Sequence, residues 1–186
     1  MTGYFKGRSE TSVSSKSTNK NVLSVYVKIL ENAYSDSDYW YLTGNDFLLD
    51  KLYDLDDLDL LELRHDLCNW APNELEIFSG ALESDYSGSH DDLLPKRIYL
   101  YGYLMTLANQ YLDIDKRIAA RLININTDFI SEGYLKDKRL LEEIKKTLNS
   151  VEIVPGIIGD PTKCYMDIVR FALIKNTIQK LFDAAN

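Results

Sequence analysis

The sequence has few of the residues from which metal and redox sites are built. It contains two histidines and two cysteines in 186 residues. His65 and Cys68 are three residues apart, but His90 and Cys164 are isolated. Structural zinc sites bring their ligands in closely spaced pairs. We therefore expect no metal ion and two reduced, buried thiols, as in a cytosolic protein.

Motifs for catalysis and phosphate binding are also missing. The chain has no glycine-rich phosphate loop, nucleophile elbow or paired histidine–acid motif. The run Asp54–Asp59 lacks the central glycine of a calcium loop, and its leucines favour a helix entrance that buries Leu55, Leu58 and Leu60. Paired carboxylates carry no information, because 29 acidic residues offer many chance pairs. We expect a non-catalytic chain without a cofactor.

Long hydrophobic runs are absent as well. The longest uncharged run, residues 98–112, is too short to span a bilayer and contains four tyrosines. The first residues lack the apolar core of a signal peptide. We expect a cytoplasmic protein that does not insert into membranes. The net charge of −8 would repel phosphates, which argues against nucleic acid as the direct partner.

Helical spacing of apolar residues recurs along the chain, and no segment alternates with the period of a strand. The final helix has the clearest start, with Asp160 as cap and Pro161 in its first position. We predict an all-α fold: a single globular domain, residues 21–186, of about seven or eight helices. It forms an irregular bundle or a HEAT-like stack of helical hairpins. The expected helices are 21–33, 46–53, 57–70, 72–82, a long helix capped by Asp91 and Asp92 that reaches 112, 115–131, 138–148, and the one that starts at Pro161.

Acidic residues are concentrated in one region. Residues 31–92 contain 17 acidic side chains against Lys51 and Arg64, a net charge of −15. Acids at helix starts interact favourably with unpaired backbone amides and with the helix dipole. This accounts for about seven of the 17, namely Asp46, Asp56, Asp57, Asp59, Glu74, Asp91 and Asp92.

Three acids also form a stripe on the helix from Asp57, of which Glu62 and Asp66 are not explained by a helix start. Asp59, Glu62 and Asp66 share one face, beside an apolar stripe that we expect to be buried. Glu62–Asp66 and Asp50–Asp54 are like-charge pairs at i, i+4, each destabilising by about 0.2–0.5 kcal/mol. A basic partner would relieve this repulsion. The apolar stripe consists of Leu60, Leu63, Leu67 and Trp70.

Residues 1–20 carry a net charge of +3 and are rich in serine, threonine, lysine and glycine. This composition buries little apolar surface. We expect either a flexible, solvated tail or an arm that lies on the acidic region.

Aromatic side chains accompany the acids between residues 36 and 41. Tyrosine and tryptophan often anchor protein interfaces, and clustered charges steer association. The alternative is that Trp40 is buried in the core, in which case at least one of Tyr39 and Tyr41 faces outward. The pairing of carboxylates with neighbouring tyrosines is similar in chemistry to colicin DNase immunity proteins, although no motif aligns.

These features predict a protein-binding inhibitor with a basic protein partner, either a toxin or another nucleic-acid-handling protein. The concrete form is a bacterial immunity protein that neutralises a nuclease-type toxin. The alternatives are a non-catalytic helical adaptor or regulatory subunit, and a phage-encoded inhibitor that mimics DNA. The predicted partner-binding residues are Asp36, Asp38, Tyr39, Tyr41, Asp50, Asp54, Asp59, Glu62 and Asp66.

Overall fold

The structure is a computed structural model that describes residues 13–32, 44–84, 93–125, 127–131 and 135–185. Most of the described residues are helical and almost none are in strands, so the predicted all-α fold is confirmed. Their one β-pairing is a two-residue parallel bridge between β1 and β2. The elements are α1 (Lys20–Asn32), α3 (Asn45–Tyr53), α4 (Asp57–Leu67), α5 (Pro72–Glu83), α6 (Leu93–Leu107), the 3-10 helix η2 (Ala108–Tyr111), α7 (Lys116–Ile123), α8 (Thr127–Ser131), α9 (Lys138–Glu152), β1 (Ile158–Gly159), β2 (Met166–Asp167) and α10 (Ile168–Ala184).

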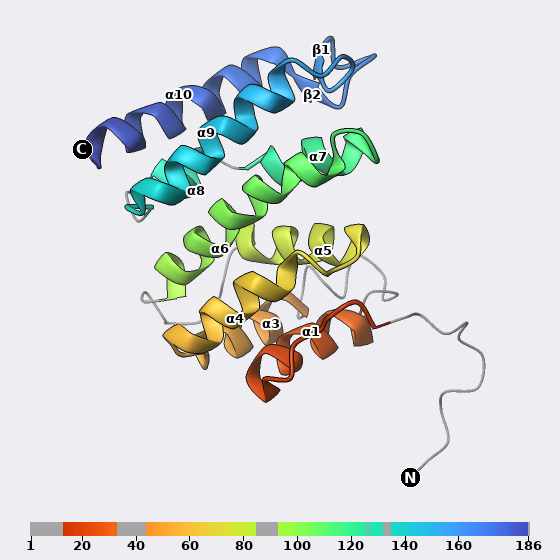
Figure 1. Cartoon of the computed structure of the whole chain (residues 1–186), viewed down its shortest axis with the longest axis vertical. Coiled ribbons are helices and arrows are strands. Elements are labelled where there is room, and N and C mark those ends of the chain that lie inside the picture. The colour runs from red at the N-terminus through yellow and green to blue at the C-terminus, as the bar shows by residue number, and fades with distance from the viewer. Residues whose placement is uncertain (1–12, 33–43, 85–92, 126, 132–134, 186) are drawn as a thin grey trace, which may run out of the picture.

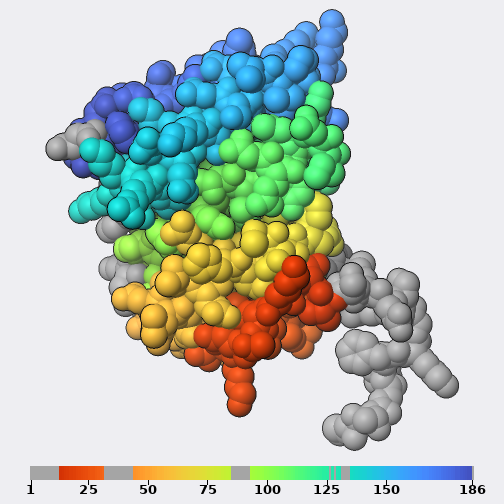
Figure 2. All heavy atoms as spheres, in the orientation of Figure 1, coloured from red at the N-terminus to blue at the C-terminus, as the bar shows by residue number. Residues whose placement is uncertain are grey.

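The helices are stacked in layers that follow the chain order (Figure 1). Helices α1, α3 and α4 form one end, and α9 and α10 form the other. The space-filling view shows the same succession of layers from the N-terminal to the C-terminal end (Figure 2). Acidic residues are therefore concentrated at one end of an elongated stack.

Helix α6 connects the two ends. It packs against α3, α4 and α5 on one side and against α7 and α9 on the other. Most of its residues are buried, as its nearly uninterrupted apolar sequence predicts. Its Arg97 is buried and donates to the carbonyls of Leu82 and Ser84 at the end of α5, which satisfies groups that the helix leaves unpaired.

An aromatic cluster fixes the acidic end. The ring of Trp70 lies 5.0 Å from that of Tyr26 on α1 and 5.3 Å from that of Phe78 on α5. Leu60, Leu63 and Leu67 are also buried, so the predicted apolar stripe on α4 is confirmed. Leu58 is 76% exposed, and the expectation that it is buried is wrong.

The predicted helix 115–131 is divided into α7 and α8. The chain leaves the helical conformation at Asn124, and Asn124 Oδ1 and the carbonyl of Ile125 accept hydrogen bonds from the guanidinium of Arg170 on α10. Hydrogen bonds from Arg170 of α10 are thus made where a continuous helix would have its own backbone hydrogen bonds.

The predicted start of the last helix is also wrong. Asp160 Oδ1 accepts from Thr162, and its carbonyl closes a single turn that does not continue. The chain instead forms strand β2, which pairs in parallel with β1. Helix α10 begins only at Ile168, with Asp167 as its cap. No helix among the described residues is both long enough and apolar enough to cross a membrane.

Candidate functional site

The acids of α4 point in two directions, because a helix presents several faces. Asp59 and Asp66 are 6% and 4% exposed and lie under residues 13–19, which we call the N-terminal strap. Asp57 and Glu62 are exposed. The strap runs beside α4 before the chain enters α1 (Figure 1). The single stripe seen in the sequence therefore contains two chemically different sets of carboxylates.

Asp59 ties the start of α1 to the start of α4. Its two oxygens accept hydrogen bonds from the side-chain amides of Asn19 and Asn21 at 2.7 and 2.8 Å. Its backbone amide donates to Asp56 Oδ1 at 2.8 Å, as part of a capping box. Asn19 Oδ1 accepts in turn from the backbone amides of Asn21 and Val22, as a helix cap does.

Asp66 accepts four hydrogen bonds. Oδ1 accepts from the backbone amide of Lys16 at 2.7 Å and from Asn69 Nδ2 at 3.2 Å. Oδ2 accepts from the hydroxyl of Ser15 and, at 2.9 Å, from Trp70 Nε1. Both lone pairs of each oxygen are thereby used. Asp66 joins the strap to the buried tryptophan that organises this end of the molecule.

The surroundings of both carboxylates favour the ionised form. Hydrogen bonds from Asn19 and Asn21 lower the pKa of Asp59. For Asp66, burial raises the pKa, but the combined hydrogen bonds from Ser15, Trp70, Lys16 and Asn69 lower it more, and the net result is a lowered pKa. The sequence suggested that a basic partner would relieve the repulsion between these acids. In the structure, uncharged hydrogen-bond donors of the chain itself stabilise the carboxylates of Asp59 and Asp66.

The strap has two further anchors. Ser14 donates its backbone amide to the hydroxyl of Tyr26 at 2.7 Å, and that hydroxyl donates to Glu74 Oε1 at 2.9 Å. Ser17 donates its hydroxyl to Glu62 Oε1 at 2.8 Å. Lys16 contributes only its backbone, so the contacts of the strap depend on polar groups and not on its positive charge.

A second set of acids faces outward from α3, from α4 and from the turn between them. We call this set the exposed acids. Asp54, Asp56, Asp57 and Glu62 form no ion pair with any described residue. Tyr53, Leu58 and Leu61 are exposed among them. The set consists of Asp50, Asp54, Asp56, Asp57 and Glu62.

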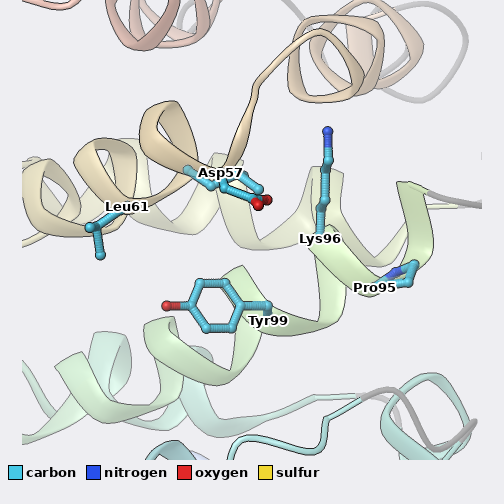
Figure 3. A pocket seen from close by; sticks show the side chains of 6 residues that line it. Asp57, Leu61, Pro95, Lys96 and Tyr99 are labelled. Atoms are coloured by element: carbon cyan, nitrogen blue, oxygen red, sulfur yellow. The ribbon is translucent and has the colours of Figure 1, made fainter.

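A groove of about 400 Å³ opens between α4 and α6, beside the exposed acids. Figure 3 shows Asp57 and Leu61 of α4 across from Lys96 and Tyr99 of α6. Lys96 Nζ donates to the carbonyls of Tyr53 and Leu55 at 2.9 and 2.6 Å, which caps the end of α3.

The predicted partner-binding residues therefore fall into three groups, of which the structure describes two. Asp50, Asp54 and Glu62 are on the outward surface, whereas Asp59 and Asp66 are buried under the strap. The remaining four, Asp36, Asp38, Tyr39 and Tyr41, lie outside the described residues, as does Trp40.

Ser15, Asn19 and Asn21 were not among the residues predicted to be important. The only sequence signal for them was the composition of the N-terminal arm, which suggested that it could lie on the acidic region. Serine and asparagine have no charge by which a sequence reading would pair them with particular acids.

His90 lies outside the described part of the chain, and His65, Cys68 and Cys164 do not form a ligand set within it. No group of three or more potential ligands lies close enough there to hold a metal ion. Cys68 is exposed and Cys164 half-buried, so the expectation of two buried thiols is wrong. No protein-family model, curated protein or solved structure matches the chain.

Proposed function

We propose that this protein binds and inhibits a basic partner protein by covering the surface with which that partner handles nucleic acid. A bacterial immunity protein that neutralises a nuclease-type toxin is the concrete form of the proposal. One observation carries it: Asp54, Asp56, Asp57 and Glu62 are exposed together and have no cationic partner among the described residues.

The mechanism is electrostatic and steric. Clustered carboxylates accelerate the encounter with a basic surface, and their attraction falls as salt rises. Apolar side chains such as Leu58 and Leu61 then exclude water at the contact. A partner whose lysines and arginines are occupied in this way has no free surface for phosphate.

A non-catalytic adaptor subunit is the second candidate, and a different surface favours it. The outer face of α10, at the opposite end of the stack, exposes Ile168, Val169 and Leu173 at helical spacing. Stacked helical proteins ordinarily end in a polar face. An adaptor would cover this apolar face within a permanent complex.

An immunity protein is expected to be encoded beside the gene of its toxin, so co-expression with the product of the neighbouring gene tests the inhibitor proposal. We expect a complex at low salt and loss of the partner's nuclease activity. The Asp54→Lys/Asp57→Lys variant should weaken the complex, because it adds positive charge to the surface that faces the basic partner. Asp113→Lys/Asp183→Lys changes the net charge equally at exposed positions elsewhere and serves as the matched control. Absence of a complex, or equal loss in both variants, contradicts the proposal.

A further inference from the structure

The groove between α4 and α6 has an apolar interior. Leu60, Leu61, Pro95 and Tyr99 contribute most of its lining, and Lys96 and Asp57 complete it (Figure 3). Its volume of about 400 Å³ lies at the lower end of the range for ligand pockets, roughly 300–1,000 Å³. This volume suits one or two large side chains better than a cofactor.

Most polar groups at the walls already have partners. The Tyr99 hydroxyl accepts a hydrogen bond from Arg64 Nη1 at 2.7 Å, and the guanidinium also lies over the ring of Tyr103, 4.7 Å from its centroid. The ammonium of Lys96 is held by two backbone carbonyls. An occupant therefore gains little by offering hydrogen bonds to these two groups and more by offering apolar surface.

Negative charge surrounds the opening. Asp57 is part of the lining and forms no ion pair with a described residue, and Asp54 and Asp56 are exposed in the turn that leads into α4. Leu58 and Leu61 are exposed on the same helix, 76% and 45% respectively. The site thus combines an apolar floor with an acidic rim.

We propose that this groove receives a leucine- to phenylalanine-sized side chain from a segment of the partner protein in which lysine or arginine flanks the apolar residue. The inference rests on the proposed function, because it locates the anchor of the same interface. The apolar side chain fills the groove while the flanking cations pair with Asp54 and Asp57. A second copy of this chain is disfavoured as occupant, because residues 31–92 of both copies carry a charge of −15 and would repel each other.

A labelled peptide tests the groove independently of the natural partner. The probe is a fluorescein-labelled helical peptide in which leucines at i, i+4 spacing are flanked by lysines. Its two controls replace the leucines by serine or the lysines by glutamate. We expect the leucine peptide to bind and the glutamate peptide not to bind. The affinity of the serine peptide should be lower by a factor of about ten or more.

Two pairs of variants assign the binding to the groove. Leu61→Trp places an indole at the groove wall and should lower affinity about tenfold, whereas Ile114→Trp, at an exposed apolar position away from the groove, should bind as the unaltered protein does. Asp57→Lys should lower affinity about fivefold or more, and Asp113→Lys should not. Far-ultraviolet circular dichroism confirms that each variant is folded, and the charge pair still decides the question if Leu61→Trp unfolds.

The outcomes separate this inference from the proposed function. Equal binding of the leucine and serine peptides, or unchanged binding to both Leu61→Trp and Asp57→Lys, overturns the groove proposal and leaves the inhibitor proposal standing. Self-association that Leu61→Trp abolishes also overturns it, because a second copy is then the occupant. If the peptide binds as expected but no complex forms with the neighbouring gene product, the inhibitor function fails and the groove remains a binding site.

Discussion

At the scale of single residues, neighbouring carboxylates on one helix have opposite surroundings. Asp66 is buried and accepts four hydrogen bonds, whereas Asp57 is exposed and has no ion-pair partner among the described residues. The helical period groups Asp59, Glu62 and Asp66 from the sequence alone. It does not indicate that the N-terminal strap covers Asp59 and Asp66, because the donor groups of the strap come from residues about 40 to 50 positions earlier and carry no charge.

Replacing Asp66 by asparagine should destabilise the protein. The amide nitrogen would face two donors in place of an acceptor oxygen, so two hydrogen bonds to a charged group are lost. One such bond contributes about 1.5–3 kcal/mol, and we expect the free energy of unfolding to fall by at least the value of one bond. Urea denaturation measures it, with the exposed Asp113→Asn as control. A loss no greater than that of the control would contradict the role of Asp66.

The strap should also respond to acid. The pKa values of Asp59 and Asp66 are lowered from the ordinary 3.8 in the folded protein. A group with a lowered folded pKa stabilises the protein fully above its unfolded pKa, and this contribution is lost as the pH falls through the folded value. The free energy of unfolding should therefore decline as the pH falls below 3.8. Asp66→Asn should reduce this dependence, and an identical pH profile for that variant would exclude Asp66 as its source.

At the scale of elements, the sequence predicted most helices but not where tertiary contacts interrupt them. Pro72 begins α5 and the apolar stripe of α4 is buried, because both depend on local chemistry. The break after α7 depends on Arg170, and the late start of α10 depends on pairing between Ile157 and Met166. These partners are distant in the sequence and leave no periodic signal.

The start of the last helix can be tested with two aspartates. Asp167 Oδ1 accepts from the backbone amides of Val169 and Arg170, so Asp167→Ala should cost about 0.5–2 kcal/mol as the loss of a helix cap. Asp160→Ala removes the bonds to Thr162 in an exposed turn and should cost less. Thermal unfolding of both variants provides the comparison. A larger loss of stability for Asp160→Ala would instead support a last helix that begins after Asp160, as the sequence suggested.

At the scale of the whole molecule, two surfaces lie at opposite ends of the stack (Figure 1). The end formed by α3 and α4 is acidic with scattered leucines, whereas the first turns of α10 expose the apolar side chains of Ile168, Val169 and Leu173. Composition located the acidic end in the sequence. It did not identify the groove beside it, because the groove requires α6 to lie next to α4.

The salt dependence of association tests the central proposal most directly. If the exposed acids guide a basic partner, the association rate constant with the neighbouring gene product should fall about tenfold or more from low to high ionic strength. It should fall much less for Asp54→Lys/Asp57→Lys, because the attraction is already weakened at low salt. A rate constant that is independent of salt, or equally dependent in both proteins, would contradict a binding site at the exposed acids.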